Sequence, residues 1–304
     1  MNTPTLREQI SGLIQLTRWK EYLPFVIPLT VVGGLLATST TGQTLDWRLL
    51  AVTIGNVLVV AYAFMINDIE DAADDARDPD RAARNPISSG RIGVRFGYAA
   101  CRLVAAVTLL FYIPGGFWVI LIGIATLLLS HFYSWRPVRL KAWPITDIVS
   151  HSLMLSGLLL LAGYFTYGYD PGVVWLVAAG VTLVSVYGQL YNQLRDFEMD
   201  KAAGLHNTAI MLGEKNTQRA MYMTIGLAAA CLIIAAAYGV FPFWLGLVAL
   251  AGIPISLLLA PRTDMRGGAA ADISGSLQIQ SIIILNLTIC VWLIEVLVRQ
   301  MFLS

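Results

Sequence analysis

The sequence predicts an all-α integral membrane protein with about nine transmembrane helices around a central cavity, and three observations lead to this prediction. Apolar residues make up 57% of the 304-residue chain, the mean hydropathy is +0.69, and only 13% of the residues are charged. Soluble domains carry about 25% charged residues. The charges are also segregated, and the stretches without Asp, Glu, Lys or Arg are 22–45, 49–67, 103–135, 148–169, 171–194, 220–261 and 273–294. Because about 20 apolar residues cross the hydrocarbon core as a helix, each stretch predicts at least one span.

Two of these stretches are long enough for two spans each. Pro114 to Gly116 divides 103–135, and Gly239 to Pro242 divides 220–261, because Gly and Pro in succession are typical of turns. The predicted spans are therefore 22–40, 49–67, 98–113, 117–134, 148–167, 172–192, 219–238, 242–260 and 275–297. A connector at 262–276 precedes the last span.

The distribution of Lys and Arg predicts the topology. With the N-terminus inside, every Lys and Arg except Arg48 and Arg299 falls on the inner side. An excess of these residues marks the cytoplasmic side, so we expect the N-terminus inside and the C-terminus outside. The chain is predicted to form one multi-pass domain, 1–304, of the cell (inner) membrane. The segment 1–21 is inside, and the Asp-rich inner loops 68–97 and 195–218 are expected to cap an active site on the cytoplasmic side.

The first of these loops follows directly from the second span. Asn67, Asp71 and Asp75 occupy positions i, i+4 and i+8, so on a continuing helix they share one face, and Asp68 lies beside them. Asn192, Asp196 and Asp200 have the same spacing at the end of the sixth span. The repeat predicts two similar halves that face each other across a common cavity, where repeat-built membrane proteins place their sites.

Two carboxylate clusters so close to a membrane indicate a cation site. Oxygen-rich clusters suit Mg²⁺, which uses one or two carboxylates together with substrate phosphates and water. A basic loop, 135–147, holds Arg136, Arg139 and Lys141, which can form charge-assisted hydrogen bonds with phosphate. Bound metal would neutralise a departing diphosphate, and the apolar spans would surround an isoprenoid tail. One acidic loop alone is most often solvated, and topology alone explains many of the basic residues. The matched spacing of two clusters favours a site.

At these residues the chain resembles the UbiA superfamily of intramembrane prenyltransferases. The patterns NDxxDxxxD at Asn67 to Asp75 and DxxxDxxxG at Asp196 to Gly204 are similar to its two signature motifs. Tyr133 and Ser134, followed by RPVRLK, resemble its third element, and Asp147 also fits. The resemblance covers about residues 20–300.

The resemblance implies a Mg²⁺-dependent enzyme that transfers a prenyl group from an isoprenoid diphosphate to a lipophilic acceptor and releases pyrophosphate. The expected metal ligands are Asn67, Asp68, Asp71 and Asp75 for one ion and Asp196 and Asp200 for a second. Asp71, Asp75, Asp196, Asp200 and Tyr133 are the expected catalytic residues. Residues expected to bind the diphosphate or line the pocket are Asn67, Asn192, Arg84, Arg139, Lys141, Ser134 and Lys201. Arg18 is similar to a family Arg that is usually followed by Pro, whereas Trp19 follows here.

The acceptor stays open at this point. The segment ARNPISSG at 83–90 is closer to branches that end in PIxSG, which act on chlorophyllides, homogentisate, glycerol-lipid or sugar-phosphate acceptors, with Asn85 as an apparent insertion. The expected partners are the diphosphate, the acceptor and the bilayer, and nothing indicates nucleic acid. The sequence predicts neither the length of the prenyl chain nor the oligomeric state of the protein.

Other functions are weaker alternatives. A cation-coupled transporter would also have many helices and a repeat, but transporter sites lie near the midplane and these carboxylates lie at one face. A lipid phosphotransferase would usually show one cluster, and a structural subunit has no need of two.

Overall fold

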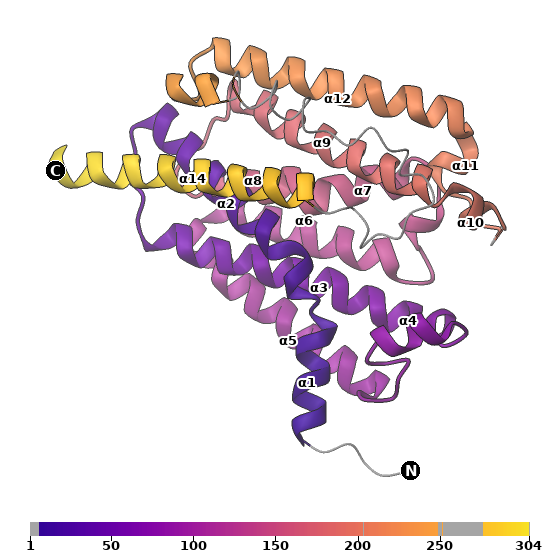
Figure 1. Ribbon diagram of the computed structural model, residues 1–304. Coiled ribbons are helices and arrows are strands. Elements are labelled where there is room, and N and C mark those ends of the chain that lie inside the picture. Colours follow the sequence, from indigo (N-terminus) through magenta and orange to yellow (C-terminus); the bar gives the residue numbers. More distant parts are fainter. Residues whose placement is uncertain (1–5, 203, 249–250, 252–275, 304) are drawn as a thin grey trace.

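The computed structural model describes residues 6–202, 204–248, 251 and 276–303, and within them the chain is helical with short turns (Figure 1). In chain order the elements are α1 (Leu6–Leu16), α2 (Trp19–Thr41), α3 (Trp47–Asp75), α4 (Pro79–Arg84), α5 (Val94–Tyr112), the 3-10 turn Ile113–Gly115, α6 (Phe117–Ser134), the 3-10 turn Leu140–Ala142, α7 (Thr146–Ser152), the π-helical turn Leu153–Gly157, α8 (Leu158–Phe165), α9 (Val174–Arg195), α10 (Phe197–Ala202), α11 (Thr208–Leu212), α12 (Glu214–Ala237) and α14 (Ser276–Leu303).

Eight of the predicted spans match helices that are long and apolar enough to cross a membrane. The remaining prediction, 242–260, lies largely outside the described residues, although 243–248 is helical. The connector predicted at 262–276 lies almost wholly outside them. The all-α fold is therefore confirmed over the part of the chain that the structure describes.

The two Asp clusters lie at the same end of the helical bundle but differ locally. In Figure 1 the short helices that follow them, α4 and α10, both lie at the end opposite the C-terminus. The helix α3 continues to Asp75, so residues 68–75 are helical rather than part of a loop. By contrast α9 ends at Arg195, and Asp196 takes a non-helical conformation before α10 begins. The second cluster therefore differs from the first by a break at one residue, although the Asp196 and Asp200 amides still donate to the Asn192 and Asp196 carbonyls at 3.0 Å and 2.8 Å.

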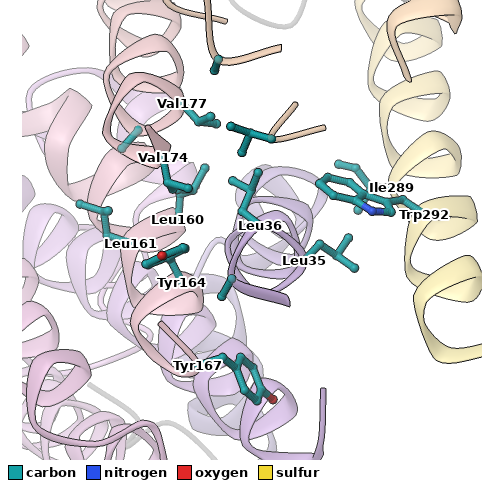
Figure 2. Packing of buried hydrophobic residues seen from close by; sticks show 14 of the residues in the cluster. Leu35, Leu36, Leu160, Leu161, Tyr164, Tyr167, Val174, Val177, Ile289 and Trp292 are labelled. Atoms are coloured by element: carbon teal, nitrogen blue, oxygen red, sulfur yellow. The ribbon is translucent and has the colours of Figure 1, made fainter. Parts of the chain in front are cut away.

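The helices α2 and α8 approach each other closely because two glycines meet. A Cβ on Gly33 would lie 2.1 Å from the Leu160 carbonyl oxygen, and one on Gly163 would lie 2.1 Å from that of Thr30. Small residues allow such backbone contact between membrane helices. Beside this crossing, Figure 2 shows Leu35 and Leu36 of α2 between α8 and the side chains that α14 contributes. In the same figure Trp292 of α14 points toward α2, and this contact packs α14 against the bundle.

A buried polar network joins four helices in the apolar interior. The Asn56 amide nitrogen donates to Thr30 Oγ1 at 2.7 Å and to the Leu159 carbonyl at 2.9 Å, and its oxygen accepts from the Tyr112 hydroxyl at 2.7 Å. The Tyr112 ring fits between Gly55 and Gly123, where an added Cβ would lie 2.7 Å and 2.2 Å from ring atoms. Because no water competes in the hydrocarbon region, these bonds fix the relative positions of α2, α3, α5 and α8.

We expect Asn56→Ala to destabilise the protein. The substitution leaves the buried Tyr112 hydroxyl without its acceptor, which costs about 1–3 kcal/mol, and it also removes the bonds from Asn56 to Thr30 and to the Leu159 carbonyl. The thermal unfolding midpoint in detergent should fall by several degrees. Thr288→Ala is the matched control, because Thr288 bonds only within its own exposed turn of α14. Equal midpoints for Asn56→Ala and wild type would show that the network contributes no stability.

Candidate active site

The first cluster is built around one lysine. Lys141 Nζ donates to Asn67 Oδ1 at 2.8 Å and to Asp71 Oδ2 at 2.5 Å. Asn67 Oδ1 also accepts from Ser134 Oγ at 3.1 Å. Burial lowers the pKa of the Lys141 ammonium below its ordinary value, and the Asp71 carboxylate opposes that shift. Two oxygens of the predicted metal set therefore already converge on a cation.

Arg139 reaches the same carboxylate from the basic loop. Its Nη2 lies 3.2 Å from Asp71 Oδ1 and 3.4 Å from Asp74 Oδ2. The residue has a φ of 44°, which is uncommon for a residue with a Cβ. The turn is closed by its amide, which donates to the Trp135 carbonyl at 2.7 Å. This conformation directs the loop back across α3.

Glu70 attaches the start of the basic loop to α3, and it was not predicted as a site residue. Its carboxylate accepts from the Tyr98 hydroxyl at 2.7 Å and from the Arg136 amide at 3.2 Å. The Arg136 guanidinium extends to Asp74 at 3.3 Å. Glu70 and Asp74 form an i, i+4 pair beside the Asn67 stripe, and that spacing is the signal by which a second acidic face could have been found.

Asn85 folds the segment after α4 onto α3. Its side-chain nitrogen donates to Asp75 Oδ2 at 2.9 Å and to the Asp68 carbonyl at 2.7 Å. Its oxygen accepts from the Ile87 amide at 2.9 Å, and Ser88 Oγ bonds the Ala72 carbonyl at 2.8 Å. The residue that looked like an insertion is thus buried, and it links the PISSG segment to the Asp cluster.

The junction of α1 and α2 completes this side of the site. Arg18 Nη1 lies 3.5 Å from Asp68 Oδ1, while its Nε and Nη2 bond Glu21 at 2.8 Å and 2.6 Å. Its guanidinium also lies over the Phe64 ring, 4.7 Å from the centroid. A cavity of about 660 Å³ opens here, lined by Arg18, residues of the first cluster, Arg81, Arg84 and Asn85. Arg84 itself is exposed, and its carbonyl accepts from Gln15 at 2.8 Å.

The carboxylates of the second cluster have partners of their own. The Arg195 side chain donates to both oxygens of Asp196 at 2.9 Å, and Asn207 Nδ2 donates to Asp200 Oδ2 at 2.7 Å. Burial raises the pKa of Asp200 above its ordinary value, while Asn207 and the charge of Arg81 oppose that shift. Arg81 of α4 is therefore close enough to Asp200 to interact with it electrostatically.

The other predicted residues of this half differ in exposure. Asn192 is half-buried, and its carbonyl accepts from the Asp196 amide at 3.0 Å, whereas Lys201 is exposed. None of the residues of the second cluster lines the cavity beside the first.

Tyr133 is the next-to-last residue of α6. It interacts electrostatically with both Asp71 and Asp147, and its ring centroid is 6.0 Å from that of His151. Ser134, Arg139 and Lys141 thus contact Asn67 or Asp71, but neither they nor Tyr133 line the cavity beside the first cluster.

Asp147 organises the approach to the second cluster through two residues that sequence reasoning missed. Its Oδ2 accepts from Gln193 Nε2 at 2.7 Å and from the Thr208 amide at 2.9 Å, and Thr208 Oγ1 bonds Oδ1 at 2.5 Å. Gln193 also accepts from the Ala209 amide at 3.0 Å. The carboxylate is almost completely buried. These bonds join α7, α9 and α11 and so fix both ends of the segment that carries Asp200.

The donor set fits Mg²⁺, although the carboxylates are not gathered into one closed site. Within the described residues, no three His, Cys, Asp or Glu side chains are close enough to hold a metal by themselves. Mg²⁺ characteristically takes few protein ligands and completes its shell with phosphate and water. The position of Lys141 Nζ between Asn67 and Asp71 marks where a cation is stabilised. In the second half, Arg195 Nη1 is buried and has no hydrogen-bond partner among the described residues, so it is available to an anion.

Comparison with known proteins identifies relatives over most of the chain. The profile of the UbiA prenyltransferase family matches residues 26–292. The digeranylgeranylglyceryl phosphate synthase of Methanoculleus marisnigri is 30% identical over 264 residues, which cover 85% of this chain and 87% of that protein. The 4-hydroxybenzoate octaprenyltransferase of Acidovorax ebreus is 27% identical over 256 residues, covering 81% and 84%.

The fold is also similar to solved structures. A UbiA homolog from Archaeoglobus fulgidus bound to GPP and Mg²⁺ superposes with a TM-score of 0.74 at 20% identity, covering 94% of this chain and 99% of that one. A UbiA homolog from Aeropyrum pernix gives a TM-score of 0.63, covering 91% and 97%. Together with its apolar helices, these matches make the chain a multi-pass membrane protein.

We expect Asp147→Ala to loosen the segment between α9 and α11. The change leaves Gln193 and Thr208 without their shared acceptor, so trypsin should cleave after the exposed Lys201 several-fold faster in detergent. Asp170→Ala is the control, because Asp170 bonds the Gly172 amide between α8 and α9, at the far end of α9 from Lys201. An unchanged cleavage rate in Asp147→Ala would contradict the assignment.

Proposed function

The chain belongs to the UbiA prenyltransferase family, and from this we propose that it transfers a prenyl group from an isoprenoid diphosphate to a lipophilic acceptor, releases pyrophosphate and requires Mg²⁺. The observation that supports this most directly is the convergence of Lys141 and Arg139 on Asn67 and Asp71. In such a site the diphosphate can take the place of Asp71 as the partner of Lys141 and Arg139, and the metal ion can take their place as the partner of Asp71.

The metal sites of the proposal follow the motif positions. Asn67, Asp68, Asp71 and Asp75 would hold one Mg²⁺, and Asp196 and Asp200 a second. When bound, Mg²⁺ neutralises charge on the diphosphate and so makes it a better leaving group. Arg81 lines the cavity beside the first cluster and also interacts electrostatically with Asp200, which supports a diphosphate bound near both clusters.

The residues of the basic loop would bind the diphosphate directly. On binding, Arg139 and Lys141 would leave Asp71 and bond diphosphate oxygens instead. Their hydrogen bonds are charge-assisted both before and after this change of partner. Arg84 in the first half, and Asn192, Lys201 and the unpaired Arg195 Nη1 in the second, would add polar contacts. Because Lys141 is largely removed from water, solvent screens its charge only weakly. Its ammonium would therefore stabilise the negative charge that develops on the diphosphate in the transition state.

The reaction would proceed by ionisation of the bond between C1 and oxygen. The bonding electrons leave with the diphosphate, and an allylic carbocation forms beside Tyr133 and Ser134. An aromatic face stabilises a nearby cation, and Tyr133 is close enough to the site to interact electrostatically with Asp71 and Asp147. A nucleophilic carbon or oxygen of the acceptor then bonds to C1 and releases its proton. The apolar interior excludes water that would otherwise capture the cation.

The proposal also includes the side of the membrane that the active site faces and the class of the prenyl acceptor. The active site would face the cytoplasm, because the Lys and Arg residues gather at the end of the bundle that carries the Asp clusters. The acceptor class remains the broad one of lipophilic molecules. Relatives are named for a glycerol-lipid phosphate product and for 4-hydroxybenzoate, and a structural neighbour was solved with GPP.

The proposal predicts loss of activity when either cluster is broken. Asp71→Ala and Asp196→Ala should each lower kcat/KM for prenyl transfer by at least about 100-fold, because a charge-stabilising interaction in the transition state contributes about 3 kcal/mol. EDTA should abolish activity and Mg²⁺ should restore it. The measurement is mass-spectrometric detection of prenylated product, together with pyrophosphate release, for a panel of diphosphates and acceptors.

Controls for this experiment lie close to each cluster. Asp80→Ala and Glu198→Ala remove exposed carboxylates near the first and second clusters and should leave kcat/KM unchanged. The proposal is wrong if Asp71→Ala and Asp196→Ala both keep wild-type activity. It is also wrong if folded wild-type protein produces no pyrophosphate with any diphosphate on the panel.

A further inference from the structure

A second cavity lies at the opposite end of the bundle from the Asp clusters. It has a volume of about 750 Å³, within the range of small-molecule sites, and is formed by the end of α2, the turn after α12 and the last turns of α14. The α2 end that lines it is followed directly by α3, which begins at Trp47. Asn67 lies 20 residues further along α3, about 30 Å away at 1.5 Å per residue. A ligand here is therefore separated from Asp71 by the hydrocarbon thickness of a bilayer and belongs to a different site.

The charged residues that line this cavity are Glu295 and Arg299, one turn apart on α14. Arg299 Nη2 lies 2.6 Å from Glu295 Oε1, and Trp244 Nε1 donates to the other carboxylate oxygen at 2.8 Å. The Arg299 side chain is 70% exposed, so its guanidinium keeps N–H groups for a ligand. An exposed pair of this kind contributes little to stability, so a ligand can open it at little cost.

The wall beside this pair offers an unused hydrogen-bond donor. Gln300 Nε2 is buried and has no partner among the residues that the structure describes. Since a buried amide without a partner is costly, a ligand acceptor at this position would be favoured. Gln300 and Arg299 together form a place for an anionic group.

Aromatic side chains form the remaining wall. Trp292 and Phe241 pack edge to face with centroids 6.2 Å apart, and Trp292 is fixed against α2, as Figure 2 shows. Trp244 is fixed by its bond to Glu295. Aromatic faces beside a carboxylate attract a cationic amine. The cavity therefore presents an anion-binding end and a cation-binding end about one helical turn apart.

We propose that this cavity binds the headgroup of a phosphatidylethanolamine-type lipid. The lipid phosphate would bond Arg299 and Gln300, and its ammonium would donate to Glu295 and face the aromatic wall. Phosphate and ammonium are joined by two carbons in this headgroup, which suits charges on residues i and i+4. The acyl chains would follow the exposed apolar side of α14, where Leu297 and Val298 lie.

The charge pattern also predicts which headgroups bind less well. A choline headgroup carries no N–H group to donate to Glu295. A glycerol headgroup carries no cation, so Glu295 loses Arg299 to the phosphate and gains no positive partner in exchange. The expected order of affinity is thus ethanolamine first, with choline and glycerol headgroups weaker.

Native mass spectrometry of the full chain in mild detergent tests this proposal. The protein would be titrated with ethanolamine, choline and glycerol phospholipids that carry identical acyl chains. We expect wild type to bind the ethanolamine lipid at least about tenfold more tightly than the other two. Glu295→Gln and Arg299→Gln should remove most of that preference. Arg48→Gln, which changes an arginine near the same end of the bundle but outside the cavity, should keep it.

Several outcomes would overturn the proposal. Equal affinity of wild type for the three lipids would mean nonspecific lipid contact only. Tightest binding of the glycerol lipid would make this a site for anionic headgroups. Wild-type preference in both Glu295→Gln and Arg299→Gln would exclude these residues from the site. The comparison among lipids uses wild-type protein, so it decides the question even if a variant fails to fold. It requires no prenyl transfer, so its result is independent of the proposed enzymatic function.

Discussion

The contact of the Lys141 ammonium with Asn67 and Asp71 is the interaction on which the rest of the site depends. A lysine so far removed from water needs a negative partner, and a carboxylate at the end of a membrane span needs a cation. Several features of the surrounding structure serve to make this contact possible. Glu70 fixes the start of the basic loop through Arg136 and Tyr98, and the left-handed turn at Arg139 brings the loop back across α3.

The two Asp clusters look alike in the sequence but differ in the structure, and the difference suggests different tasks. In the first, Asp71 lies on an unbroken helix and is paired with cations from another segment. In the second, the helix ends at Arg195, and Asp196 is paired with its own neighbour in the chain. The first cluster is therefore tied to the fold of the basic loop, whereas Asp196 of the second is paired within its own segment.

The sequence predicted features that arise from local patterns. Charge-free stretches located the spans, and the i, i+4, i+8 spacing placed Asn67, Asp71 and Asp75 on one face of a helix. Contacts between distant residues could not be predicted, since no spacing pairs Asp147 with Thr208 or Asn56 with Tyr112. Asn85 looked like an insertion because its function depends on the fold of α4 back onto α3. The break at Asp196 could not be predicted, because the same residue spacing is compatible with a continuous helix and with a helix interrupted at one residue.

The central claim is that Lys141 and Arg139 leave Asp71 for the diphosphate when metal binds. The most direct measurement is an experimental structure of the protein with Mg²⁺ and a prenyl thiodiphosphate, which resists ionisation. We expect a metal ion on Asn67 and Asp71, with Lys141 Nζ within hydrogen-bond distance of a diphosphate oxygen instead of Asp71. A structure in which the diphosphate binds elsewhere, while Lys141 still contacts Asp71 and Asn67, would contradict this account.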